Sequence, residues 1–248
     1  MRASERAMGF FQKIKQRGFF NLLARVCQII VPESFLRFSV WEIFELDVNS
    51  ATATQMSENV LIENVSNDQA KRKLLQQLTW NSVELAELEK HHGYLTRLSE
   101  QSASESGVGG LWVATGQYPE TALGFRMIFQ PRQAWIYAAY VNQAIRGKSI
   151  YQRTLAFACE DLDRQGWEEI LVAVAPWNKA SMYVHKKHSK QKVGRVVAVR
   201  FLKFAAIFHF GNIMKSKTFT SDYIERPIQI TTQSTQPLPP QSIDVPAI

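Results

Sequence analysis

The sequence predicts a mixed α/β (α+β) fold: a mixed, mostly antiparallel sheet with a central parallel βαβ unit, flanked by helices. Three successive strand-like segments joined by short turns indicate antiparallel pairing. They are followed by apolar residues at helical spacing and by an unbroken apolar run, which is typical of a strand buried on both faces. A strand, a helix and a buried strand in this order form a βαβ unit with parallel strands. The segments are 111–115, 122–129, 135–141, 150–162 and 170–175.

Composition supports a globular chain with a real core. The 248 residues are 46% hydrophobic and 21% charged, which excludes a disordered, collagen-like or disulfide-stapled protein. Cys27 and Cys159 both lie among apolar residues without CxxC spacing, so we expect two buried thiols in a reducing compartment and no metal site. Neither a signal peptide nor a membrane-spanning run is recognisable, and we therefore expect a cytoplasmic protein.

Charge and composition divide the chain into three parts. The net charge of +7 is concentrated before residue 38 and between Lys186 and Lys217, whereas the stretch from Glu42 to Glu105 is mostly acidic. Such basic regions could bind an anionic ligand or surface, or simply be solvated, and no motif of specific nucleic-acid binding accompanies them. We predict a basic amphipathic helical segment, one domain and a disordered tail rich in Pro, Gln and Thr, over residues 1–38, 39–222 and 223–248.

The amphipathic pattern of residues 8–31 allows two interpretations. Apolar residues recur there at three- and four-residue steps with basic residues between them. Such a helix can pack on its own domain or lie on an anionic membrane surface, which would make the protein membrane-peripheral.

The remaining elements follow from pattern and capping residues. We expect helices capped by Asn67 or Asp68 and by Asn178, and a further helix from Ser82 to Leu98. The stretch Val193–Phe210 suits one long strand or two. The other expected segments are a strand at 41–48, loops at 49–59 and 99–110, and a tail from residue 231.

The most informative segment joins the strand 135–141 to the helix that follows. It reads Asn142-Gln143-Ala144-Ile145-Arg146-Gly147-Lys148-Ser149-Ile150-Tyr151. A glycine-containing turn that opens a helix directs backbone N–H groups outward, where the helix dipole also favours an anion. Arg146 and Lys148 add positive charge, and Ser149 is placed to cap the helix. This pattern predicts a phosphate-binding loop.

On these residues the sequence resembles the GNAT acetyltransferase superfamily. Its acyl-CoA motif, Gln/Arg-x-x-Gly-x-Gly/Ala, also follows a strand and opens a helix; here Ala144 stands first and Ser149 replaces the second glycine. Family members carry an Asn at the last helix, a small residue three positions on, a Tyr at seven and a Lys at nine. The corresponding residues are Asn178, Ser181, His185 and Lys187, followed by Val193-Gly194-Arg195.

The resemblance implies direct acyl transfer from acetyl-CoA, as acyl donor, to an amine acceptor of unknown identity. The strand edge after Tyr140 would bind pantetheine and polarise the thioester carbonyl. His185, where the family often has Tyr, would protonate the leaving thiolate. For the base, Tyr137, Tyr140 and a water held by Glu42 or Glu45 all remain open. The implied cofactor-binding residues are Val141, Arg146, Gly147, Lys148, Ser149, Ile150 and Asn178, with His185 and Tyr140 as catalytic residues.

A second function class also remains open. Because the loop departs from the family pattern, the chain could instead be a catalytically inactive GNAT-like module that binds a partner through its basic surfaces. Acyl-chain preference and oligomeric state are not fixed by the sequence.

Overall fold

The computed structural model describes residues 36–52, 60–81, 83, 88–99, 107–120, 123, 125–201, 204–215 and 226–230. The predicted amphipathic segment 8–31, Cys27 and the tail from residue 231 lie outside these residues. Residues 36–38, which the sequence assigns to the basic segment, belong to the first strand, and residues 226–230, assigned to the tail, form the last one.

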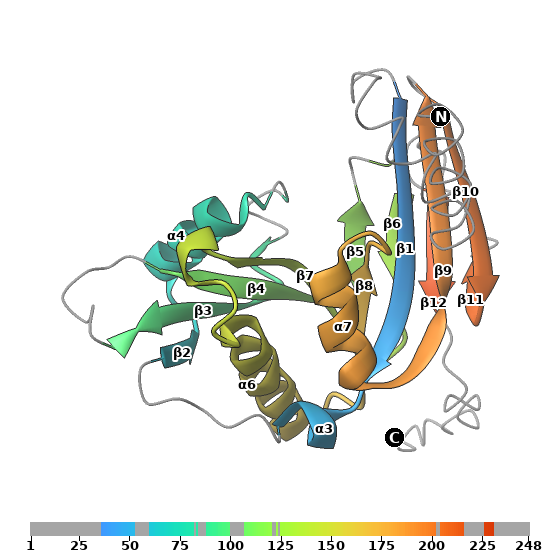
Figure 1. Ribbon diagram of the computed structural model, residues 1–248. Helices are drawn as coiled ribbons and strands as arrows, with labels where there is room; N and C mark the ends of the chain where they lie inside the picture. Colours follow the sequence, from blue (N-terminus) through green and yellow to red (C-terminus); the bar gives the residue numbers. More distant parts are fainter. Residues whose placement is uncertain are drawn as a thin grey trace, which may run out of the picture.

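The elements alternate along the chain as Figure 1 shows. In order they are β1 (Leu36–Leu46), α3 (Val48–Thr52), β2 (Val60–Asn64), α4 (Gln69–Thr79), β3 (His92–Leu98), β4 (Gly109–Thr115), β5 (Gln117–Glu120), β6 (Phe125–Ile128), β7 (Gln133–Val141), the 3-10 helix η2 (Gln143–Ile145), α6 (Ile150–Arg164), β8 (Glu169–Val174), α7 (Lys179–Lys187), β9 (Ser189–Phe201), β10 (Phe204–Gly211), β11 (Ile213–Lys215) and β12 (Arg226–Ile230).

Two sheets form the framework. The large sheet has the strand order β10-β9-β1-β8-β7-β4-β3-β2, and among the described strands its neighbours are antiparallel except for β7 and β8. The second sheet has the order β11-β12-β6-β5. The predicted fold class is confirmed: the sheet is mixed and mostly antiparallel, and β7, α6 and β8 are its central parallel βαβ unit.

Several predicted elements are confirmed by their caps. Asp68 precedes α4 and its Oδ1 accepts a hydrogen bond from the Lys71 N–H at 3.0 Å. Asn178 caps α7 in the same way, through the Ser181 N–H at 3.2 Å. The stretch from Val193 to Phe210 forms two paired strands, β9 and β10.

The helix expected to run to Leu98 is wrong in its second half, because residues 92–98 form strand β3. Leu95 and Leu98 are three positions apart, which imitates helical spacing. The strand is covered on both faces, so Tyr94 and Leu95 are buried in different clusters and the usual alternation is lost. Gly93 supports this packing, since a Cβ there would lie 3.0 Å from Leu75.

Other corrections concern the strands. The predicted meander is wrong: β4 and β7 pair directly, and β6 leaves the large sheet to pair with β5 and β12. The turn containing Pro119 is itself strand β5, at the edge of the second sheet, where a missing N–H is tolerated. Strand β1 runs from 36 to 46 rather than 41 to 48, and α3 occupies part of the expected loop at 49–59.

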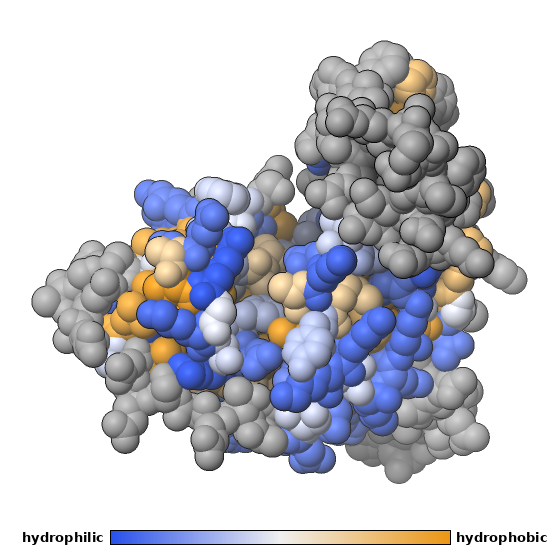
Figure 2. All heavy atoms as spheres, in the orientation of Figure 1, coloured by the Kyte–Doolittle hydropathy of each residue, from blue (hydrophilic) through white to orange (hydrophobic). Residues whose placement is uncertain are grey.

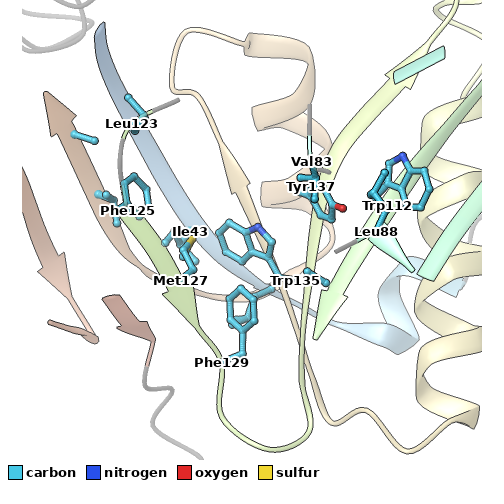
Figure 3. Packing of buried hydrophobic residues seen from close by; sticks show 14 of the residues in the cluster. Ile43, Val83, Leu88, Trp112, Leu123, Phe125, Met127, Phe129, Trp135 and Tyr137 are labelled. Atoms are coloured by element: carbon cyan, nitrogen blue, oxygen red, sulfur yellow. The ribbon is translucent and has the colours of Figure 1, made fainter. Parts of the chain in front are cut away.

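The large sheet is covered on both faces. On one face, α4 and the second sheet enclose a core that includes Leu75, Phe125 and Trp135. Figure 3 shows Phe129 against Trp135 in this layer, and their rings stack with centroids 5.6 Å apart. On the other face, α6 and α7 pack over a second cluster that contains the buried Cys159. Burial raises the pKa of this thiol to about 12.

Candidate functional site

The parallel strands β7 and β8 separate halfway along their length. Their ladder runs from Gln133 paired with Glu169 to Ile136 paired with Val172, and ends there. Two residues later Ala138 has φ 45°, a left-handed conformation that costs an L-residue about 1 kcal/mol. In Figure 1 strands β3 and β4 run at a large angle to β1, β9 and β10, so the two halves of the sheet diverge at this point.

A cavity of about 600 Å³ lies where the strands diverge. Its walls come from the ends of β7 and β8, the loop before α6, the first turn of α6 and the inner side of α7. Its polar and loop lining includes Tyr137, Tyr140, Arg146, Gly147, Tyr151 and His185. Hydrophilic residues gather over α7 on the face seen in Figure 2, and its last turn contains His185, Lys186 and Lys187.

The loop before α6 has the geometry of an anion-binding turn. Gly147 has φ 86°, and an ideal Cβ built there meets no atom within 4 Å, so the space beside it is open. Ser149 occupies the N-cap position of α6 as expected, but it has φ 57° and its hydroxyl makes no capping hydrogen bond. The N–H groups of the first helical turn have no acceptor within the helix. They are therefore directed outward at the mouth of the cavity.

Arg146 and Asn178 flank this loop. The Arg146 Nε donates to the Val141 carbonyl at 3.0 Å, which folds the side chain back over the end of β7. Its guanidinium carbon lies 6.0 Å from the centre of the Tyr140 ring. Asn178 lines the opposite side of the cavity, on the loop that leads into α7. Lys148 is exposed and is not among the lining residues.

His185 and Tyr151 face each other across the inner part of the cavity. His185 is 1% exposed, and its Nε2 lies 3.0 Å from the Tyr151 hydroxyl. Its Nδ1 lies 3.1 Å from the Ser181 carbonyl, which can only accept a hydrogen bond. The proton of a neutral ring is therefore on Nδ1, and Nε2 accepts from the Tyr151 hydroxyl.

Burial sets the ionisation of this pair. It lowers the pKa of His185 to about 4, with a smaller contribution from the neighbouring His188, so the imidazole is neutral at neutral pH. Burial also raises the pKa of Tyr151 well above its usual range, so the hydroxyl keeps its proton. Of the two side chains, Tyr151 is the one that presents a proton.

The two glutamates considered for the base are engaged elsewhere. Glu42 pairs with Lys192 and Arg195, and Glu45 accepts from Lys190 at 2.9 Å and from Gln191 at 2.6 Å. Neither lines the cavity.

The structure brings most of the predicted site residues together. The cavity is lined by Tyr140, Val141, Arg146, Gly147, Ser149, Ile150, Asn178 and His185. Sequence reasoning gave no role to Tyr151, although this residue stands where the family often has Gly or Ala. Tyr151 lies two residues after Ser149 in the sequence, and nothing in this local position indicates that its side chain contacts α7.

Comparison with known proteins adds the family. Residues 74–195 match the model of the acetyltransferase (GNAT) family. Among solved structures, an IAA acetyltransferase from Bacillus cereus is 16% identical and aligns over 52% of this chain and 74% of its own, with a TM-score of 0.37. An aminoglycoside acetyltransferase from an uncultured soil sample is also 16% identical, over 56% and 95%, with a TM-score of 0.41.

A GCN5-related N-acetyltransferase-like protein from Streptococcus suis is 12% identical and aligns over 71% of this chain and 66% of its own, with a TM-score of 0.46. No curated protein sequence matches the chain.

The stretch that matches the GNAT acetyltransferase family model, residues 74–195, includes all the residues that line the cavity. Within the described residues, no group of three or more potential metal ligands and no helix long and apolar enough to span a membrane is present.

Proposed function

We propose that the protein is an active N-acyltransferase that moves an acyl group, acetyl first of all, from acyl-CoA to an amine by direct transfer. The observation that carries this proposal is the continuity of one cavity, which reaches from the phosphate-type loop at Gly147 to the Tyr151–His185 pair. An anion site and a proton donor at two ends of one opening are what a charged thioester cosubstrate requires.

The loop before α6 offers acyl-CoA both open space and hydrogen-bond donors. The pyrophosphate would lie against the N–H groups of Gly147 to Ile150, beside the Arg146 guanidinium. The open space beside Gly147 supports this fit, because any larger residue would place its side chain there. Beyond Ile136 the edge of β7 is released from its ladder with β8, and its backbone groups near Val141 can bind pantetheine and polarise the thioester carbonyl.

Tyr151 is our candidate for the donor that assists departure of the thiolate. The Tyr151 hydroxyl can turn from the His185 Nε2 toward the sulfur. Its hydrogen bond to the sulfur then stabilises the negative charge that develops there. Before transfer His185 acts as a positioning residue: its Nε2 accepts from the Tyr151 hydroxyl, while the Ser181 carbonyl fixes the imidazole ring. The predicted role of His185 as direct proton donor is replaced by this arrangement, because its Nε2 carries no proton.

A thermal-shift titration with acetyl-CoA tests the proposal, with CoA and ATP as comparisons. A ligand that binds only the folded state raises the melting temperature as its concentration passes Kd. We expect acetyl-CoA and CoA to raise it and ATP to leave it unchanged. Absence of a shift at millimolar acetyl-CoA would contradict the proposal and favour an inactive module that acts through its basic surfaces.

A further inference from the structure

A bulge in β7 turns two tyrosines toward the same side. Trp112 of β4 is opposite Tyr137, and Gly110 is opposite Tyr140, so two residues of β7 match one residue of β4. In a regular strand residues three apart point to opposite faces. The extra residue, with Ala138 at φ 45°, restores both tyrosines to one face. That face is the side of α4, because Trp80 contacts Tyr140 and Asn81 contacts Tyr137.

The position of Trp80 is not explained by the stability of the fold. This residue ends α4 with φ 47°, and its backbone N–H caps the helix through the Gln76 and Gln77 carbonyls. Glycine makes the same cap without strain. The indole is 82% exposed, so it buries little surface in return. Backbone strain beneath an exposed aromatic ring points to a contact outside the chain.

Tyr140 connects Trp80 to the cavity. The Trp80 and Tyr140 rings are tilted by 50° with centroids 5.7 Å apart, and Tyr140 lines the cavity. The Arg146 guanidinium lies on the same tyrosine ring and carries a positive charge, which opposes a second cation there. The two rings therefore suit a neutral planar ring better than an ammonium group.

Tyr137 supplies a polar group next to these rings. Its hydroxyl lies 2.6 Å from the His91 Nδ1 and receives a hydrogen bond from the Asn81 amide at 3.3 Å. Since Asn81 can only donate through this nitrogen, the hydroxyl is oriented to donate to His91. Figure 3 shows the hydroxyl directed away from Trp135. His91 is buried, whereas Tyr137 lines the cavity.

We propose that this α4 side of the cavity binds the amine acceptor, and that the acceptor carries an aromatic ring which packs on Trp80 and Tyr140. The inference rests on the proposed acyltransferase function. The amine nitrogen forms a bond to the thioester carbonyl carbon, and the carbon–sulfur bond breaks. One nitrogen-bound proton passes to the Tyr137 hydroxyl as the tyrosine proton moves to the His91 Nδ1, and it returns to solvent by the reverse path through Tyr137, which lines the cavity. The departing thiolate takes the Tyr151 proton, which solvent replaces.

The test compares 2-phenylethylamine with its saturated counterpart, 2-cyclohexylethylamine, as acceptors of the acetyl group from acetyl-CoA in the full chain. We expect kcat/KM to be about tenfold higher for the aromatic amine, which corresponds to the gain from one aromatic pair. Trp80→Gly should raise KM for 2-phenylethylamine about tenfold without lowering the melting temperature, because glycine relieves the strained backbone. Phe208→Ala removes another exposed aromatic residue, 56% exposed, from β10 and outside the cavity lining, and serves as the control.

The second half of the proposal concerns kcat. Tyr137→Phe should lower kcat at least tenfold, while Kd for acetyl-CoA stays the same. Because the variant has no hydroxyl to accept the amine proton, the pH dependence of kcat that this transfer causes should also disappear. Equal use of the two amines, or a Trp80→Gly effect on Kd for acetyl-CoA instead of KM for the amine, would overturn the acceptor assignment. If acetyl-CoA binds but the aromatic amine is not preferred, this inference alone fails. If acetyl-CoA does not bind, the proposed function fails with it.

Discussion

The two sides of the cavity are built in different ways. On the α6 side, Gly147, Ser149 and Tyr151 lie within five consecutive residues, and one helix start determines their geometry. On the α4 side, Trp80, His91 and Tyr137 come from separate segments: the Tyr137 hydroxyl lies 2.6 Å from the His91 Nδ1, and the bulge in β7 brings Tyr140 to the same face, against Trp80. The first side depends on local backbone conformation, whereas the second depends on packing between elements. Substitutions should therefore act locally on one side and at a distance on the other.

The largest effect that we expect is on stability and comes from His185. The pKa of His185 falls from 6.5 in the unfolded chain to about 4 in the folded protein. Below pH 6.5 the unfolded state therefore binds a proton that the native state does not bind. Stability is therefore fully present above pH 6.5 and falls as the pH drops toward 4. At about 1.4 kcal/mol per pH unit, the loss is about 3 kcal/mol.

Urea unfolding at pH 7, 6, 5 and 4 measures this loss, and His185→Gln is the comparison. Glutamine can still accept from Tyr151 but does not titrate, so the slope due to this site should vanish. His92 also has a lowered pKa and remains in both proteins. Parallel curves for the two proteins would contradict the assignment to His185.

The second effect concerns the anion loop and is a change in affinity. Gly147→Val should raise Kd for acetyl-CoA about 100-fold, or about 2.7 kcal/mol, because the side chain enters the space left for phosphate. Gly166 offers a matched control, since it too has φ 86° and open space around its Cβ, but it follows the other end of α6. Calorimetric titration of Gly166→Val should give an unchanged Kd. An equal loss in both variants would mean that backbone strain, not the site, is responsible.

The third effect lies on the α4 side and acts through packing. A Cβ at Gly110 would lie 2.3 Å from the Leu75 Cδ1 and 2.5 Å from the Tyr94 carbonyl oxygen, and the carbonyl cannot move aside cheaply. Gly110→Ala should therefore lower the free energy of unfolding by about 2 kcal/mol. It should also displace α4 with Trp80, so the affinity for acetyl-CoA should survive while amine use declines. Unchanged stability in urea would contradict this account.

Much of the fold could be predicted because its signals are local. Asp68 and Asn178 mark helix starts by their side chains alone, and the apolar run of β8 is short and unbroken. Strand β3 could not be identified in the same way, since burial of both faces removes the alternation that defines a strand. Its spacing then matches a helix equally well.

The candidate site shows the same difference between local sequence signals and contacts made by packing. The loop from Arg146 to Ser149 is recognisable from its glycine, its charges and its place between strand and helix. Neither the bulge at Ala138 nor the reach of Tyr151 to His185 has a sequence signal, because an alanine at φ 45° is set by the surrounding sheet. Pairings of this kind require the three-dimensional arrangement.

The smallest effect that we predict separates the proton donor from the positioning residue. Tyr151→Phe removes the hydroxyl between His185 and the cavity and should lower kcat about tenfold, or about 1.4 kcal/mol, with Kd for acetyl-CoA unchanged. Tyr94→Phe deletes a hydroxyl that binds Asp161 at 2.9 Å, outside the cavity lining, and should leave kcat as it is. A rapid acetyl-transfer assay on both variants decides the point. If Tyr151→Phe keeps full kcat, solvent protonates the thiolate, and the Tyr151–His185 bond only holds α6 against α7.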